Sequence, residues 1–261
     1  MTKNKTILLT FDVEEFDTAL LHHIPLTMQQ QMEVGQEGLL NVISMLNTVN
    51  NPPSTFYTTA NFADFYPETI REISKRHEIA SHTYYHTTFK EEDILKSKLR
   101  LEEIIEKPIY GFRMPNMADF DKSLIHKSGY LYDSSINPTY LPGKYNYLHY
   151  PVTPFKYHNT TEIPVSVVPF LRFPLFWLSF KNLPLWLFIF LCNLTLAKTG
   201  HLNLYFHPWE FADLSSYKIP KFIVNPDGEK LTKKLQKFIA YYQKKQDVQF
   251  KTTVEFFKAH C

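Results

Sequence analysis

The sequence predicts an α/β fold, a distorted (β/α) barrel with mainly parallel strands. Strand-like and helix-like segments alternate along the chain, and no internal repeat interrupts them. The 261 residues suit one large domain with a sizeable core but are short for two full domains. Repeated βα units in a chain of this length favour a parallel sheet that curls into a barrel. We therefore expect a single domain over residues 1–261.

The expected strands are short runs rich in β-branched and apolar residues. They lie at residues 5–11, 54–58, 77–81, 109–113, 130–134, 162–168, 202–206 and 248–251. In barrels of this kind, functional residues follow the carboxyl ends of the strands. The residues at these ends are therefore the first candidates for a site.

The expected helices fill the intervals between the strands. They lie at residues 37–50, 67–75, 91–107, 119–128, 183–198, 228–244 and 254–260. The pattern is strongest over 91–107, where apolar residues recur every three or four positions and Pro108 stops the helix. The helix over 228–244 opens after an Asn-Pro-Asp sequence, which is typical of a helix start.

An insertion rich in proline and aromatic residues occupies residues 137–181. A loop of this length would reach the rim of a barrel near the site. We expect it to shape a groove beside the site, with Trp177 and Phe176 among its aromatic side chains.

An apolar stretch lies within residues 173–197 and overlaps the end of this insertion. Its longest uncharged piece, 182–197, has 16 residues, fewer than the about 20 that a spanning helix needs. It predicts a core helix preceded by an aromatic loop. A second interpretation is a surface that touches lipid or a lipid-linked substrate. The side chains that would form this surface are Phe173, Leu175, Phe176, Trp177, Trp186 and Phe188.

Composition excludes several classes of function. The net charge of +2 gives no basic surface for nucleic acid, so no nucleic-acid partner is expected. The chain has no glycine-rich dinucleotide or phosphate loop and no G-x-S-x-G serine-hydrolase motif. Two cysteines, Cys192 and Cys261, are too few for a thiolate zinc site; we expect a buried apolar residue and a frayed end.

The first residues carry no secretory pattern. A basic start is followed by an apolar run too short for a signal sequence, and Asp12 and Glu14 close it. This predicts a cytoplasmic protein. Whether it also associates with a membrane is not predicted by this part of the sequence. The oligomeric state is not predicted.

Two carboxylates follow the first expected strand. In extended backbone, positions i and i+2 project to one side, so Asp12 and Glu14 can face one site. His82 and His86 follow the third expected strand. On a helical turn, this i, i+4 spacing would place both imidazoles on one face. Together with a carboxylate they form a two-His, one-carboxylate set with room for water and substrate, as in hydrolytic metal sites.

Two further candidates end later strands. Arg113 could hold an aspartate through a bidentate pair and keep it ionised. His207, beside a tryptophan, is a candidate general acid because an imidazole titrates near neutral pH.

These motifs, in this order, resemble the polysaccharide deacetylases, the NodB-homology carbohydrate esterases. The resemblance covers residues 5–211. It rests on Thr-Phe-Asp-Val-Glu at 10–14, His-Thr-Tyr-Tyr-His at 82–86, Arg-Met-Pro-Asn at 113–116 and His-Pro-Trp-Glu at 207–210. It is nearest to the Asp-x-Glu, His-Pro-Trp-Glu branch associated with exopolysaccharide and surface-glycan systems. The resemblance implies a distorted barrel of the NodB-homology type.

The resemblance also implies roles for the candidate residues. Asp12 matches the catalytic base and Arg113 the residue that orients it. The metal ligands match Glu14, His82 and His86. The metal would be divalent, zinc in the first place, with cobalt or nickel as alternatives.

The remaining roles concern the substrate. His207 matches the acid that protonates the leaving amine, and the backbone N–H of Asn116 matches an oxyanion donor. Pro115 and Trp209, from the same motifs, are expected to contact the substrate. The implied substrate is an N-acetylhexosamine unit of a polysaccharide, peptidoglycan or lipid-linked glycan, from which acetate is released. With such a substrate, we expect the insertion to shape the substrate groove, with Trp177 or Phe176 stacking on sugar faces or meeting a lipid carrier.

The chain departs from the family pattern at several positions. Glutamate at 14 stands where many members have aspartate, and Asn-Met at 116–117 replaces the common Tyr-Gly. The acidic partner of His207 stays open between Asp133, Glu162 and Glu210. Two alternatives remain: an allantoinase-like amidohydrolase acting on a small amide, and a non-catalytic glycan-binding relative.

Overall fold

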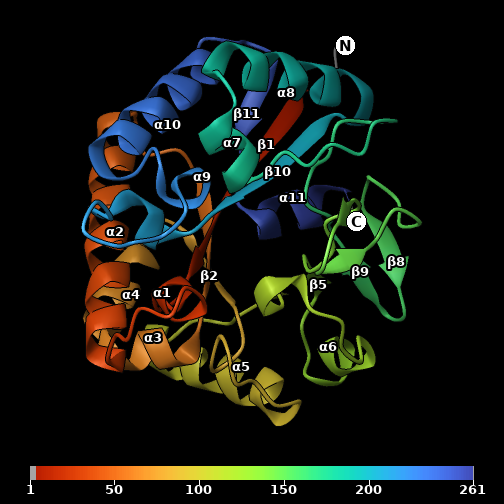
Figure 1. Ribbon diagram of the computed structural model, residues 1–261. Helices are drawn as coiled ribbons and strands as arrows, with labels where there is room; N and C mark the ends of the chain where they lie inside the picture. The colour runs from red at the N-terminus through yellow and green to blue at the C-terminus, as the bar shows by residue number, and fades with distance from the viewer. Residues whose placement is uncertain (1–3, 261) are drawn as a thin grey trace.

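A curled sheet of nine strands forms the centre of the computed structural model, which describes residues 4–260 (Figure 1). The order across it is β10 (His201–Phe206), β1 (Lys5–Val13), β2 (Ser54–Thr58), β3 (Glu78–Ser81), β4 (Gly111–Phe112), β5 (Tyr132–Asp133), β9 (Thr160–Glu162) and β8 (Phe155–Tyr157), and β11 (Val248–Phe250) pairs with the start of β1. Every pairing in this sheet is parallel except that of β8 with β9. The predicted distorted barrel of mainly parallel strands is confirmed.

Helices surround the sheet, and the longest of them cover its outer side (Figure 1). They are α1 (Thr18–Leu21), α2 (Met28–Thr48), α3 (Ala60–Phe65), α4 (Pro67–Ile73), α5 (Glu92–Ile105), α6 (Ser123–Lys127), α7 (Trp177–Asn182), α8 (Leu185–Thr199), α9 (Lys221–Val224), α10 (Gly228–Gln243) and α11 (Thr253–His260). Two short 3-10 helices, η1 (Pro115–Met117) and η2 (Pro208–Phe211), follow β4 and β10.

The first strand is the centre of the core. From Thr6 to Val13 every residue of β1 is buried, as expected for a parallel strand covered on both faces. Along one edge it pairs with β10 and along the other with β11 and then β2. The carboxyl ends of β1, β2, β3 and β10 therefore meet at one rim, where the candidate residues follow.

The barrel is completed without a regular strand. A strand was expected over 162–168, but β9 ends at Glu162 and the chain then crosses toward β10. There Ser166 N–H donates to Asn203 O, and the Asn203 amide donates to the carbonyls of Ile163 and Pro164. Pro164 has no N–H for a ladder, so side-chain bonds take the place of strand pairing.

Helix α2 begins nine residues before the expected start at 37. Thr27 and Gln30 form a capping box, in which the Thr27 hydroxyl accepts from the Gln30 N–H and Gln30 Oε1 accepts from the Thr27 N–H. A Cβ on Gly38 would lie 1.9 Å from the carbonyl oxygen of Pro208, and one on Gly35 would lie 2.7 Å from that of Glu14. The two glycines let α2 pack closely against both site loops.

Other elements are shorter than the sequence predicts. The strands expected over 109–113 and 130–134 pair over two residues each, and the helix expected over 119–128 is confined to Ser123–Lys127. The insertion at 137–181 contains the hairpin of β6 (Tyr140–Leu141) and β7 (Tyr145–Asn146), the β8–β9 pair and most of α7.

The apolar segment forms α8, as predicted. Within residues 4–260, no helix is long and apolar enough to cross a membrane. Three of the side chains considered for a lipid-contacting surface, Leu175, Phe176 and Phe188, are buried instead, because they pack into apolar clusters from the segment just before α7 and from the inner side of α8. Cys192 is also buried, and Cys261 lies outside the described residues.

Candidate active site

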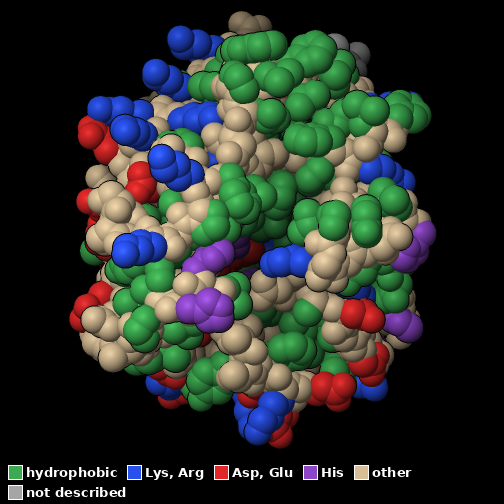
Figure 2. All heavy atoms as spheres, viewed as in Figure 1, with side chains coloured by type: hydrophobic (Ala, Val, Ile, Leu, Met, Phe, Trp, Pro, Cys, Tyr) green, Lys and Arg blue, Asp and Glu red, His purple; other side chains and the backbone are tan. Residues whose placement is uncertain are grey.

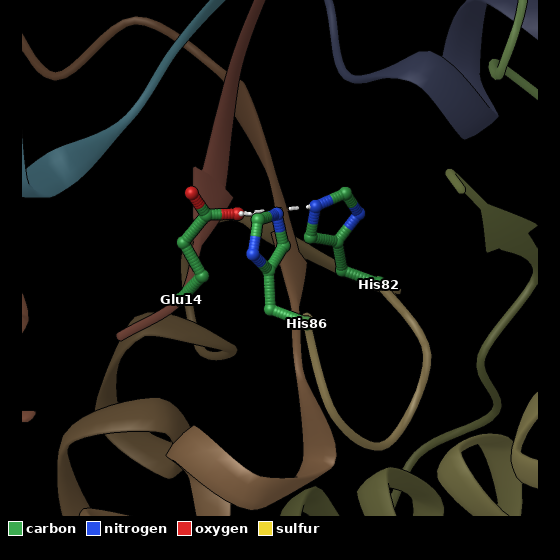
Figure 3. A group of neighbouring side chains, drawn as sticks. All are labelled: Glu14, His82 and His86. Atoms are coloured by element: carbon green, nitrogen blue, oxygen red, sulfur yellow. Dashed lines mark ion pairs between the residues drawn. The ribbon is translucent and has the colours of Figure 1, made fainter. Parts of the chain in front are cut away.

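Three potential metal ligands converge beside the carboxyl end of β1. The Oε2 atom of Glu14 lies 2.9 Å from His86 Nε2 and 3.3 Å from His82 Nε2 (Figure 3). Glu14 follows β1 directly, and His82 follows β3. The expected helical turn between the histidines is wrong: residues 82–86 form a loop in which Thr83 has φ of 62°. The loop, not helical spacing, brings the two imidazoles to the same carboxylate.

The other polar atoms of these ligands are held by neighbours. His82 Nδ1 lies 2.8 Å from the carbonyl oxygen of Arg113, and His86 Nδ1 lies 2.6 Å from Asp17 Oδ2. Both partners are acceptors, so each Nδ1 carries the hydrogen and each neutral ring has its lone pair on Nε2. The indole N–H of Trp209 donates to Glu14 Oε1 at 3.2 Å.

This arrangement fits a divalent metal ion. Two Nε2 lone pairs face Glu14 Oε2, and no described residue donates a hydrogen bond to that buried oxygen. Acceptors in such contact repel one another unless a cation or proton lies between them. Burial would raise the pKa of Glu14, but His86 and His207 lower it well below its ordinary value. Burial would lower the pKa of His86, but Glu14 and Asp17 raise it well above its ordinary value. The site therefore favours positive charge beside Glu14.

A second buried pair joins Arg113 to Asp12, two residues before Glu14. Arg113 Nη1 donates to Asp12 Oδ1 at 2.7 Å and to the hydroxyl of Thr10 at 2.8 Å. The expected bidentate pair is wrong, because the other guanidinium donors bind the carbonyl and hydroxyl oxygens of Ser134. The guanidinium also lies 3.9 Å from the ring centroid of Tyr57. Burial opposes the charge of Arg113, but Asp12 and Tyr57 raise its pKa.

A third group joins His207 to two buried charges. Glu210 Oε1 accepts from the His207 backbone N–H at 2.7 Å and lies 3.1 Å from its Nδ1. Lys181 Nζ lies 3.3 Å from Glu210 Oε2. Of the three candidate partners of His207, Glu210 is the one in contact. Asp133 and Glu162 instead pair with Lys122.

The electrostatic setting of His207 favours its charged form. Burial lowers its pKa, but the carboxylates of Glu14 and Glu210 raise it above the ordinary value. The ring stacks on Trp209, with centroids 5.1 Å apart and planes 15° apart. A protonated imidazole is the form that can donate a proton.

All three groups open into one pocket of about 590 Å³. Its mouth is the hollow near the centre of Figure 2. Asn116, expected to offer its N–H to the substrate, lines the pocket in a left-handed conformation with φ of 55°. Pro115, expected to contact the substrate, is buried at the start of η1 and is not among the residues that line the pocket. Trp209 lines the pocket and also binds Glu14, which the sequence did not indicate.

The insertion supplies much of the pocket wall. The pocket-lining residues that belong to the insertion are Leu141, Lys144, Tyr145, Phe176, Trp177 and Leu178. Phe176 and Trp177, expected to stack on sugar, are therefore at the pocket. No motif pointed to Asp17 or Lys181, which contact His86 and Glu210 from distant positions in the chain.

The chain shares its fold with solved deacetylases. One neighbour is a Mycobacterium smegmatis protein assigned to the polysaccharide deacetylases, with 22% identity, a TM-score of 0.69 and coverage of 99% of this chain and 91% of that one. The Puue allantoinase has 16% identity, a TM-score of 0.63 and coverage of 97% and 89%. A peptidoglycan N-acetylglucosamine deacetylase has 15% identity, a TM-score of 0.55 and coverage of 99% and 90%. A search of curated protein sequences found no significant match.

The family assignment rests on sequence. The profile of the polysaccharide deacetylase family matches residues 1–130, shorter than the expected stretch of 5–211. The match includes the segments that carry Asp12, Glu14, the two histidines and Arg113, whereas His207 lies beyond it. The chain belongs to the polysaccharide deacetylase family, whose members hydrolyse the N-acetyl amide bonds of glycans.

Proposed function

We propose that the chain is a divalent-metal-dependent N-deacetylase that releases acetate from N-acetylhexosamine units of a glycan. The observation that carries this proposal is the meeting of three groups in one pocket. They are the Glu14–His82–His86 cluster, the Asp12–Arg113 pair and the His207–Glu210 pair. The proposed roles follow from their chemistry.

Asp12 is the proposed base. Amide hydrolysis needs a stronger nucleophile than neutral water, so a proton must be removed as the water attacks the carbonyl carbon. Arg113 is buried against Asp12, and its hydrogen bond to Oδ1 holds the carboxylate in place at the pocket. A divalent ion held by Glu14, His82 and His86, with zinc as the first candidate, would polarise the carbonyl and make water more acidic.

His207 is the proposed acid. When the carbon–nitrogen bond breaks, the nitrogen must receive a proton, because a free amide anion is a very poor leaving group. The raised pKa of His207 keeps it protonated for this step. The N–H of Asn116, in the turn at the pocket wall, is the proposed donor to the carbonyl oxygen. The products are acetate and the free amine of the sugar.

Acetate release from N-acetylglucosamine oligomers and from peptidoglycan fragments tests this function. The protein is stripped with a chelator, reloaded with zinc, cobalt or nickel, and assayed. Activity should be lost on stripping and restored by metal. Asp12→Asn and His207→Gln should each lower the rate about 100-fold or more. The matched controls are Asp64→Asn and His126→Gln, whose side chains are not among the pocket-lining residues.

Each alternative gives a different result. Ring opening of allantoin without acetate release would indicate the allantoinase-like activity. A zinc-loaded protein that binds glycan but releases no acetate would indicate a binding protein. Activity that survives complete removal of the metal, or the Asp12→Asn change, would refute the proposed mechanism.

A further inference from the structure

A large apolar surface lies outside the pocket. It consists of a turn at residues 169–173 and one face of α8, and it is called the apolar surface below. Its exposed side chains are Phe170, Leu171, Phe173, Trp186, Phe190 and Leu194. Figure 2 shows hydrophobic side chains gathered over this part of the molecule, at the top of the view. Exposed apolar groups on this scale mark an interaction site.

The turn holds its apolar tip away from the protein. Phe170 and Leu171 are 87% and 77% exposed. Phe170 has φ of 68°, a conformation that large side chains rarely adopt, and the Val168 N–H donates to Phe173 O across the base of the turn. The backbone therefore holds two large apolar side chains in solvent at the cost of local strain.

Helix α8 continues the same surface. Trp186, Phe190 and Leu194 are spaced four residues apart and so lie along one side of the helix. Lys198, one turn further on, lies over the ring of Phe170 at 5.5 Å, which joins the turn to the end of α8. The opposite side of α8, with Phe188 and Cys192, is buried in the core. The helix thus anchors the surface rigidly.

The charge around this surface is positive. Residues 163–209 contain no aspartate or glutamate. Residues 218–245 contain eight lysines and two acidic residues, a net charge of +6 in a chain whose total is +2. These include α10, which packs beside α8 where the Tyr242 hydroxyl donates to Asn193 Oδ1 at 3.1 Å. Lys230 and Lys237 are exposed on α10, and lysines border the apolar region in Figure 2.

The apolar surface also leads to the pocket. Helix α7 connects them: Trp177 and Leu178 line the pocket at its start, and α8 follows its end. Asn182 donates to the carbonyl of Phe222, whose exposed ring lines the pocket mouth from α9. Figure 2 shows hydrophobic side chains between the top of the molecule and the central hollow.

We propose that the apolar surface docks on an anionic lipid bilayer. The turn tip and the exposed side of α8 would enter the interfacial region, while the lysines of α10 would face the lipid headgroups. A 15-residue helix is about 22 Å long, so α8 can lie at the interface but cannot span the bilayer. If the proposed deacetylase function holds, the docked pocket would act on acetylated glycans carried at the membrane.

Vesicle sedimentation tests the docking without any assay of activity. The full chain is mixed with phosphatidylcholine vesicles that contain phosphatidylglycerol, and with vesicles of phosphatidylcholine alone. Binding to the anionic vesicles should be stronger and should weaken as salt is added. The pairs Phe170→Ser with Leu171→Ser, and Trp186→Ser with Phe190→Ser, should each weaken it about tenfold or more. Lys230→Glu with Lys237→Glu should also weaken binding to the anionic vesicles, because the lysines of α10 would face the lipid headgroups.

The matched control is Leu95→Ser with Leu99→Ser, which removes exposed leucines from α5 far from the apolar surface. It should leave vesicle binding unchanged. Circular dichroism and acetate release from a short soluble oligomer report whether each variant is folded and active. Wild-type protein that ignores anionic vesicles, or variants that bind as well as wild type, would refute the docking. So would a dimer that forms through this surface in place of vesicle binding.

Discussion

Glu210 binds His207 twice, since its Oε1 atom lies 2.7 Å from the backbone nitrogen of His207 and 3.1 Å from Nδ1. His207 caps the start of η2, the short helix after β10, and Glu210 lies three positions later within it. One carboxylate oxygen thus caps the turn and also fixes the orientation of the ring. Nε2 is the ring nitrogen that Glu210 does not contact.

Glu210→Gln should shift the pH dependence of deacetylation. Glutamine keeps the shape but removes a negative charge that raises the pKa of His207. Because the proposed acid must be protonated, the alkaline limb of the kcat/KM profile should move to lower pH, and the rate at neutral pH should fall about tenfold or more. Glu255→Gln, on α11, is the control. An unshifted limb in the folded variant would show that Glu210 does not set the pKa of His207.

Lys181 and Glu210 should be coupled in stability. Both side chains are fully buried, and burial lowers the pKa of Lys181. Lys181→Met removes one of the two cationic partners of the buried Glu210 carboxylate, and we expect a loss of about 3 kcal/mol in the free energy of unfolding. The double variant with Glu210→Gln should lose less than the sum of the single losses. Denaturant unfolding of all four proteins measures this, and additive losses would mean that the pair is not coupled.

Trp209→Phe should weaken metal binding. The change keeps the packing of the ring but removes the N–H that donates to Glu14 Oε1. Groups that orient a metal ligand typically contribute about 10- to 100-fold to affinity, and we expect a zinc Kd raised within this range. Competition with a chromogenic chelator measures it. Trp186→Phe, an exposed tryptophan on α8, should leave the Kd unchanged. An unchanged Kd in Trp209→Phe would contradict a role for the indole in holding Glu14.

Local sequence patterns predicted the elements around the rim better than the contacts between them. The apolar runs of β1, β2 and β10 are buried strands, so their positions follow from composition alone. His82 and His86 meet at Glu14, but the predicted helical turn between them is wrong, because the left-handed backbone of Thr83 has no clear sequence signal. The capping box at Thr27 was visible in the sequence and gives the true start of α2.

The contacts that organise the site depend on tertiary structure. Asp17 reaches His86 across 69 positions, and Lys181 reaches Glu210 from the insertion. Spacing along the chain carries no information about such pairs. The crossing of residues 163–168 to β10 is of the same kind, because the Asn203 side chain replaces the missing ladder bonds.

Gly38→Ala should disturb the site through the backbone. The added Cβ would meet the carbonyl oxygen of Pro208, so α2 and η2 must move apart. Overpacking of this kind costs about 1 to 3 kcal/mol, and the shift should lower kcat because η2 carries Glu210 and follows His207. Thermal unfolding and acetate release measure both effects. Leu40→Ala, at an exposed position of the same helix, is the control. Full stability in Gly38→Ala would show that the contact relaxes without cost.

His201 should make the fold sensitive to mild acid. Burial lowers its pKa from 6.5 to about 4, and its ring packs on Phe256 with centroids 5.1 Å apart. The unfolded chain binds a proton below pH 6.5, whereas the folded chain resists it until about pH 4. The contribution of His201 to the free energy of unfolding is therefore complete above pH 6.5 and is lost as the pH falls toward 4. The loss is about 3 kcal/mol at most. Denaturant unfolding at pH 7 and pH 4.5 measures the loss.

His201→Gln removes the titration and should reduce the difference between the free energies of unfolding measured at the two pH values. His22→Gln, an unburied histidine near the pocket mouth, should not reduce it. An equal pH dependence in wild type and His201→Gln would place the acid sensitivity elsewhere, with His77, whose pKa burial also lowers to about 4, as the next group to test.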